Sequence, residues 1–93
     1  MTAEEPRAVD VTAVFYIGKP PRPWRFRITD EEGERRAVQV DRVITVDERR
    51  LYHLVRGYEY LCRCGISGRY RELNLAYSIE DATWWYRGSR RDR

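Results

Sequence analysis

The sequence predicts an all-β protein, an antiparallel meander of six or seven short strands curled into a small barrel or rolled sheet. Almost every segment alternates apolar and polar residues with period two, and none keeps a helical period over a useful length. Turn signals recur about every eight to twelve residues, as they do in sandwiches and barrels. A sheet of that size in 93 residues hides its edges most easily by curling on itself.

The first predicted strand spans residues 9–17. Its apolar face consists of alternate residues, namely Val9, Val11, Ala13, Phe15 and Ile17. The segment GKPPRP at 18–23 ends the strand, because three prolines in six residues cannot donate ladder hydrogen bonds. The next strand covers residues 24–29. Its inward side chains are predicted to be Trp24, Phe26 and Ile28, and its outward ones Arg25, Arg27 and Thr29.

The connection that follows sets the register of the next strand. A three-residue loop at 31–33 (EEG) places its glycine at the left-handed position that such hairpins favour. Phe26 then faces Val38 and Trp24 faces Val40, so the apolar faces of the two strands coincide. A loop of two or four residues would expose one apolar row, so we predict the three-residue loop.

The middle of the chain continues as extended segments separated by breaks. Residues 41–46 form a strand, the polar run DERR at 47–50 interrupts it, and extended structure resumes after the interruption. A short helix over residues 47–54 is the alternative. Arg56-Gly57 is predicted to be a tight turn into the strand that holds both cysteines.

The last part of the domain contains two further strands. GISG at 65–68, with a glycine at each end, predicts a hairpin loop. Leu73, Leu75 and Tyr77 share one face of the strand after it, and SIEDA at 78–82 turns the chain into TWWYR. The adjacent Trp84 and Trp85 of that final strand point to opposite faces, so only one of them fits easily in the core.

The length of the chain allows one domain with a single core. We predict a flexible N-terminus at residues 1–8, one β domain at 9–87, and a flexible basic tail at 88–93.

Composition also suggests a compartment. The chain has no stretch of 18 apolar residues, and its start, MTAEEPRAVD, lacks the basic-then-apolar profile of a secretory signal. Two closely spaced cysteines are not a disulfide framework. A cytoplasmic location with reduced thiols is expected.

Charge is unevenly distributed along the chain. Residues 1–48 carry eight basic and ten acidic side chains, whereas residues 49–93 carry ten basic and five acidic ones. All basic residues but Lys19 are arginines. This preference indicates either a genome whose codon usage favours arginine or the recognition of phosphates by forked guanidinium groups.

The ordered pattern of segments resembles a group of short uncharacterised bacterial proteins. In that group an aromatic-rich first strand leads into a Gly-Lys-x-x-Pro loop and an aromatic–Arg strand, as in VFYIGKPPRPWRFRI here. A Val-Asp-x-Val-Ile strand, a Tyr-x-Cys strand and a Trp-bearing last strand follow, as in VDRVI, YEYLCRC and WWYR. The resemblance covers about residues 9–87. It implies a small all-β domain and transfers no activity.

The CRC motif at 62–64 raises the question of a metal or redox site. In a strand Cys62 and Cys64 share a face with Cα atoms roughly 6.5–7 Å apart, at the upper edge of disulfide reach. Structural zinc needs four ligands, and the chain has only these two cysteines and His53. Cys62, Cys64 and His53 remain a weak metal candidate, and the prediction is that the thiols pack in the core and that no cofactor is bound.

Catalysis is not expected. No serine or cysteine nucleophile has a histidine at a recognisable spacing, and there is no glycine-rich phosphate loop or metal motif. The chain is therefore predicted to be a non-enzymatic binding module, whose ligand the sequence alone does not identify.

Nucleic acid is the first predicted ligand, as single strands or RNA. Small antiparallel barrels bind it by placing aromatic rings for base stacking among arginines for phosphates, and residues 56–91 contain both. The candidate contacts are Arg63, Arg69, Arg71, Trp84, Trp85 and Arg87. Replacing Trp85 or Arg71 by alanine should then impair binding without unfolding the domain.

A protein partner or a homodimer is the alternative. The loop KPPRP favours an extended polyproline conformation that fits an aromatic groove, although it also serves as a stiff connection between strands. An exposed strand edge would allow strand addition. The candidate partner contacts are Pro20, Pro21, Arg22, Pro23, Arg25 and Arg27. Arg35 extends the outward arginine ladder that begins with Arg25 and Arg27.

Overall fold

The computed structural model describes residues 7–29, 32–50 and 56–89. These residues contain seven strands and no helix: β1 (Arg7–Val9), β2 (Val11–Val14), β3 (Arg22–Thr29), β4 (Arg35–Arg50), β5 (Arg56–Ile66), β6 (Arg69–Ser78) and β7 (Thr83–Ser89). All paired strands are antiparallel, and the sheet has the order β1-β7-β6-β5-β4-β3-β2. The predicted all-β meander is confirmed.

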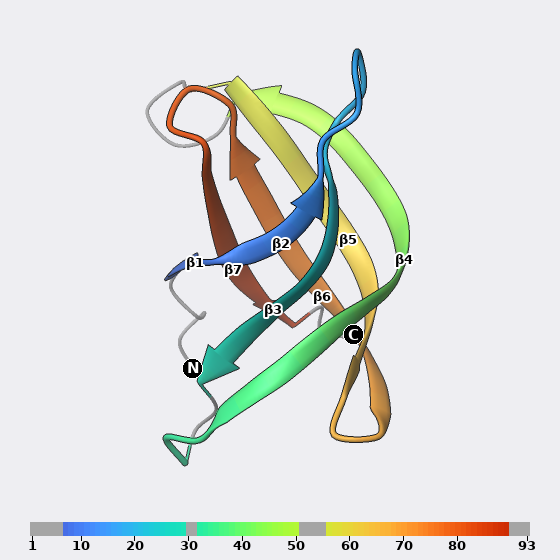
Figure 1. The fold of residues 1–93 in the computed structure, drawn as a ribbon, viewed down its shortest axis with the longest axis vertical. Coiled ribbons are helices and arrows are strands. Elements are labelled where there is room, and N and C mark those ends of the chain that lie inside the picture. The colour runs from blue at the N-terminus through green and yellow to red at the C-terminus, as the bar shows by residue number, and fades with distance from the viewer. Residues whose placement is uncertain (1–6, 30–31, 51–55, 90–93) are drawn as a thin grey trace.

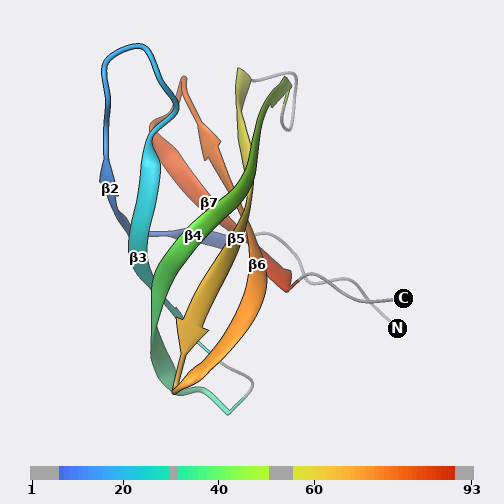
Figure 2. The same ribbon diagram turned by 90° about the vertical axis from the view of Figure 1, so that its right-hand side faces the viewer.

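The sheet curls into a partly closed barrel because two consecutive strands, β1 and β2, form its two opposite edges (Figures 1 and 2). β1 pairs with β7, and β2, which follows after only Asp10, pairs with β3. The two edges of the sheet therefore meet at Asp10. Curling hides edge hydrogen-bonding groups that a flat sheet of this size would expose.

One apolar core fills the inside of the barrel. Its buried members are Phe26, Val38, Val40, Tyr60, Cys62, Cys64, Leu73, Leu75, Tyr77 and Trp84. They come from β3 to β7 at alternate positions, as the period-two pattern predicts. The core-packing interpretation of the CRC motif is confirmed, because both cysteines are free and fully buried.

Three aromatic rings pack together in this core, and one of them also makes a hydrogen bond through its hydroxyl group. The ring of Trp84 lies 4.7 Å from that of Tyr77 and 5.4 Å from that of Tyr60, measured between centroids. The Tyr60 hydroxyl donates a hydrogen bond of 2.6 Å to the carbonyl oxygen of Pro21. Burial raises the pKa of Tyr60, so the phenol stays neutral and remains a donor.

The first hairpin agrees with the predicted register of Phe26 and Val38. Phe26 pairs with Val38 and Thr29 with Arg35, and the connection between them contains Gly33 at φ 83°, the left-handed conformation predicted for it. The second hairpin is tighter than GISG suggested. Ile66 pairs with Arg69, so its turn is Ser67-Gly68 alone, and both residues have the positive φ that a type I′ turn requires.

The predicted break at residues 47–50 is wrong, and so is the turn at Arg56-Gly57. β4 continues through both polar arginines to Arg50, and Arg49 pairs with Gly57 of β5. Polar side chains do not end a strand whose outer face meets water and whose backbone finds a partner. The helix alternative is therefore wrong for residues 47–50, and residues 51–55 lie outside the described part of the chain.

Irregularities change which residues face the core. The ladder between β2 and β3 shifts after Thr12, which pairs with Arg25, to Ala13, which pairs with Pro23. Trp24 is thereby left unpaired and half exposed while Pro23 is buried, so the predicted inward position of Trp24 is wrong.

The first predicted strand is also too long. It is divided at Asp10 and ends at Val14, so Phe15 and Ile17 are exposed in the β2–β3 loop instead of continuing the apolar face. Val9, Val11 and Ala13 do pack against the core as expected.

The ends of the predicted domain need a small correction. Arg7 and Ala8, assigned to a flexible N-terminus, pair with Tyr86 and Trp85 in the sheet. Ser89, assigned to the tail, pairs with Leu73. No helix in the described residues is long and apolar enough to cross a membrane.

Candidate nucleic-acid interface

The outer surface of β3, β4 and β5 carries a group of exposed arginines. We call it the outer arginine face, and its members are Arg25, Arg27, Arg35, Arg42 and Arg63. Its geometry follows from the register. The pairs Arg25–Gln39 and Arg27–Ala37 flank the buried pair Phe26–Val38 and therefore point away from the core.

Arg42 and Arg63 stand directly opposite each other on β4 and β5. The bulge at Asp41 creates this arrangement, because the register shifts between Val40, which pairs with Cys64, and Arg42. Like charges at directly opposite positions destabilise a sheet. The facing arginines therefore lower the stability of the isolated chain, but they form a favourable position for binding an anion.

Two carboxylates near Arg63 offset part of this repulsion, namely Asp41 and Glu72, which pairs with Arg63 on the neighbouring strand β6. Asp41 Oδ2 lies 3.7 Å from Nε of Arg63, with both side chains about half exposed. Among the described residues, Arg27, Arg35 and Arg42 have no ion-pair partner. The outer arginine face thus keeps uncompensated positive charge even though Asp41 and Glu72 lie close to it.

Two exposed rings border the outer arginine face. Tyr70 is 60% exposed, and the guanidinium of Arg63 lies 4.2 Å from its ring centroid. The ring also lies against Gly65, where a Cβ would stand 3.8 Å from Tyr70 Cε1. Trp24 is 49% exposed, and the guanidinium of Arg25 lies 5.8 Å from its ring. Each ring is thus paired with an arginine, as in sites that bind bases and phosphates together.

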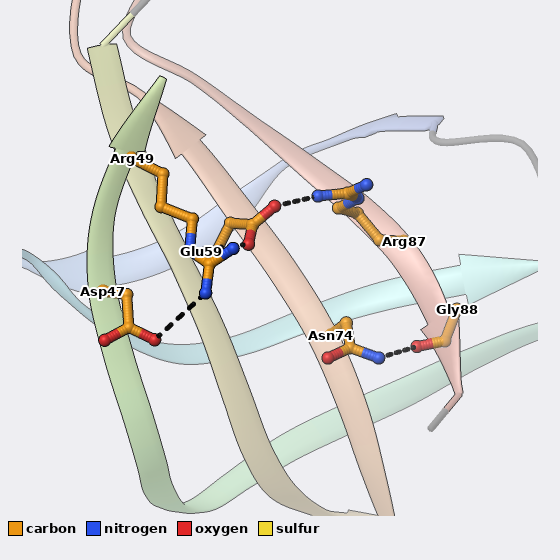
Figure 3. A network of polar contacts seen from close by, with 6 residues as sticks. All are labelled: Asp47, Arg49, Glu59, Asn74, Arg87 and Gly88. Carbon is orange, nitrogen blue, oxygen red and sulfur yellow. Dashed lines mark hydrogen bonds and ion pairs between the residues drawn. The ribbon is translucent and has the colours of Figure 1, made fainter. Parts of the chain in front are cut away.

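A second polar group occupies the same outer surface towards β7 (Figure 3). Glu59 of β5 accepts contacts from Arg49 of β4, at 3.4 Å, and from Arg87 of β7. Asn74 Nδ2 donates a weak hydrogen bond of 3.5 Å to the Gly88 carbonyl oxygen. Asp47 also lies 3.9 Å from Arg49, so two carboxylates offset the two arginines, which therefore have less charge to offer a phosphate than Arg42 has.

The structure separates the six residues that the sequence suggested for nucleic acid. Trp84 is only 6% exposed in the core, so its ring cannot stack on a ligand without unpacking. Trp85 points to the outer surface, half-buried, above the fully buried Ala76 with which it pairs. Arg87 belongs to the Glu59 network. Only Arg63 belongs to the outer arginine face.

Arg69 and Arg71 lie on the other side of the sheet. They pair with Ile66 and Cys64, and they lie on the same face of β6 as the core residue Leu73. Both are exposed because they stand beside the β5–β6 turn, at the end of the barrel. Arg36 lies near this end and approaches Ser67 Oγ at 3.4 Å. These arginines therefore form a separate basic rim and are not part of the outer arginine face.

The proline-rich segment at residues 20–23 packs against the barrel and is not exposed for binding to a partner. Pro21 and Pro23 are buried, Pro20 and Arg22 are half-buried, and the Pro21 carbonyl accepts the hydrogen bond from Tyr60. The exposed part of the β2–β3 connection is instead Phe15, Tyr16 and Ile17, the last of which is fully exposed. This loop projects from one end of the barrel (Figure 1). We call these three residues the apolar tip.

The thiols are poorly placed for chemistry. Contact with the Cys64 thiol and burial together raise the pKa of Cys62, which disfavours the reactive thiolate. Within the described residues, no three His, Cys, Asp or Glu side chains are grouped as metal ligands require. His53, the third member of the weak metal candidate, lies outside the described residues.

Sequence reasoning missed Trp24 and Arg42 as members or neighbours of the interface, and it counted Tyr70 among the aromatic residues of 56–91 without selecting it as a contact. Trp24 and Arg42 are placed by bulges, which a period-two pattern does not reveal. The exposure of Tyr70 could have been predicted from the sequence. Its partner across the tight hairpin is Gly65, which has no side chain to cover the ring.

Comparison of the chain with protein-family models, with curated proteins and with solved structures found no match. Its function must therefore be argued from its own surface.

Proposed function

We propose that this chain is a binding module whose outer arginine face binds single-stranded nucleic acid. The observation that carries the proposal is the facing pair Arg42 and Arg63, next to the exposed ring of Tyr70. Arginine binds phosphate oxygens with two parallel hydrogen bonds, and an anion between facing guanidinium groups relieves their repulsion.

The spacing of the surface suits a short run of nucleotides. The row Arg25, Gln39, Gly65 and Tyr70 crosses four neighbouring strands, and so spans about 14 Å at ~4.8 Å per strand. A nucleic-acid strand lying along this row would meet the Trp24 and Tyr70 rings near its two ends, together with the guanidinium groups of Arg25 and Arg63 that lie against these rings. Base–ring stacking and phosphate contacts of this kind tolerate many sequences.

The outer face of a curled sheet also favours single strands over duplexes. Such a face is convex, and a rigid duplex touches a convex surface along a short line, whereas a flexible single strand can follow it. The preference is therefore expected for single-stranded DNA or RNA without strong sequence selection.

The experiment is a binding titration with a fluorescein-labelled single-stranded oligonucleotide of mixed sequence, followed by anisotropy at low salt. The wild type should bind, and the double variant Arg42→Gln/Arg63→Gln should bind at least about tenfold more weakly, because two phosphate contacts are lost. Arg56→Gln is the matched control. Arg56 is an exposed arginine seven positions away on β5, paired with Glu48 and not with the outer arginine face. Equal loss in the control would refute the proposed site.

The absence of catalysis and a cytoplasmic location belong to the same proposal. The burial of both thiols supports the first of these, because a buried thiol lies out of reach of a substrate. Membership in the group of short bacterial proteins that the sequence resembles likewise stays a proposal.

A protein partner is the second candidate function, and the apolar tip favours it. Its three consecutive large side chains are exposed, fully at Ile17 and by more than half at Phe15, and none of them belongs to the buried core. Exposed apolar surface of this kind often marks an interaction site.

A further inference from the structure

A cleft opens on the side of the barrel where β1 and β2 diverge. After Asp10 the chain leaves β7 and pairs with β3, so a gap remains between β2 and the turn that joins β6 to β7. The cleft has a volume of ≈ 460 Å³, within the range of small-ligand sites. Asp10, Phe15, Tyr77 and Trp84 are among the residues that line it.

Aromatic rings form one wall of the cleft. Phe15 meets Tyr77 edge-on with centroids 5.7 Å apart, and Tyr77 lies 4.7 Å from Trp84. Phe15 is 61% exposed, so the outer ring of this series is accessible. Faces of such rings attract organic cations, most strongly where water is partly excluded.

The charged residue in the cleft also favours a cation. Among the described residues that line it, Asp10 is the only charged one, although the chain holds 18 lysines and arginines. The neighbouring turn that contributes Ala82 also carries the exposed acids Glu80 and Asp81. The cleft is therefore acidic on a protein whose net charge is +3, and it would repel the anions that the outer arginine face attracts.

The backbone beside the cleft indicates a peptide. Within the described part of the chain, β2 pairs with β3 and with no strand on its other edge. An extended peptide can add to such an edge through main-chain hydrogen bonds, while side-chain pockets beside the edge provide selectivity. The apolar tip follows β2 directly and extends the surface that this peptide would meet.

We infer that the cleft binds a lysine or arginine side chain of an extended peptide that pairs with the free edge of β2. The cation lies against the exposed ring of Phe15 and is neutralised by Asp10. The inference deepens the second candidate function, a protein partner, and is independent of the outer arginine face. It assigns that partner a chemistry, namely a basic segment in extended conformation.

The test compares two peptides that differ in one charge. Acetyl-Thr-Val-Arg-Val-Thr-amide and its citrulline counterpart have nearly the same shape and hydrogen-bonding groups, but citrulline is neutral. Each is titrated into ¹⁵N-labelled protein and followed by NMR. Shifts are expected at the Trp84 indole and the β2 amides, with the arginine peptide binding roughly three- to tenfold more tightly.

Three variants make the outcome specific. Asp10→Asn should remove most of the preference for arginine over citrulline, and Phe15→Ala should weaken both the binding and the preference. Tyr16→Ala, an exposed ring that does not line the cleft, should keep the preference.

Several results would overturn the inference. They are equal binding of the two peptides, shifts confined to Asp41 and Glu72 on the outer surface, no shifts at all, or self-association through β2 that excludes the peptide. If instead peptides bind only through the apolar tip, with Ile17→Ser abolishing binding and Asp10→Asn leaving it unchanged, the second candidate function stands and the cationic assignment fails.

Discussion

At the residue scale, the rings packed around Tyr60 determine how well the barrel holds together. Tyr58, Tyr77 and Trp84 surround Tyr60, and its hydroxyl joins β5 to the β2–β3 loop through Pro21. A buried hydroxyl with its acceptor and a large ring with its neighbours are both costly to remove, for different physical reasons.

Tyr60→Phe should lower the free energy of unfolding by about 1–2 kcal/mol. The change removes only the hydroxyl and leaves the Pro21 carbonyl without its protein donor. Urea unfolding followed by circular dichroism measures it. Because burial raises the pKa of Tyr60 above that of the unfolded chain, the wild type should also lose stability as the pH rises above about 10, where the unfolded tyrosine ionises. Tyr60→Phe should flatten this loss.

Trp84→Ala should destabilise the protein by about 3–5 kcal/mol, since it empties a large site between Tyr60 and Tyr77. Trp24→Ala removes the same side chain from a half-exposed position and should cost about 1 kcal/mol or less. Denaturant midpoints of the two variants provide the comparison. If both variants lose the same stability, the assignment of Trp84 to the core is wrong.

At the scale of elements, alternation predicted the strands well and their irregularities poorly. The paired faces of β3 and β4, the core face of β6 and the opposite orientations of Trp84 and Trp85 all follow from period two. The bulges at Trp24 and Asp41 do not, because VDRVITV and PPRPWRF offer apolar residues in either phase. Long-range pairing decides which phase is buried, and that information is absent from a local pattern.

The same limit explains the missed end of β4. DERR has low strand propensity, yet β5 pairs with it, and Glu48 and Arg56 form an ion pair across the two strands. Tertiary partners therefore override local propensity at residues 47–50. The outer arginine face was only partly predictable for the same reason: Arg25, Arg27 and Arg63 were identified separately, and the sheet brings them together.

Substitutions in the β5–β6 turn test the turn type assigned to residues 67 and 68. Ser67 has φ 50° and Gly68 has φ 79°, values that suit Asn-Gly better than Ser-Gly. Gly68→Ala should destabilise the protein by about 1–2 kcal/mol because of its Cβ, whereas Ser67→Asn should be neutral or raise stability by a few tenths of a kcal/mol. Thermal unfolding of both variants measures the two effects. A neutral Gly68→Ala would contradict the assigned turn.

At the scale of the whole molecule, the barrel separates surfaces of different chemistry. The outer face of β3, β4 and β5 is basic, and the side where β1 and β2 diverge carries an acidic aromatic cleft and the apolar tip. The division arises because one N-terminal segment closes the sheet and leaves a free edge on β2. The two proposals therefore assign a nucleic acid and a basic peptide to different surfaces of the molecule.

The most direct test of the outer arginine face is the salt dependence of oligonucleotide binding. If Arg25, Arg27, Arg42 and Arg63 each contact a phosphate, the logarithm of the binding constant should fall against the logarithm of salt concentration with a slope of about −3. Arg42→Gln/Arg63→Gln should reduce the slope to about −1.4, and Arg56→Gln should leave it unchanged. A slope near zero in the wild type, or no binding at the lowest salt, would contradict the account.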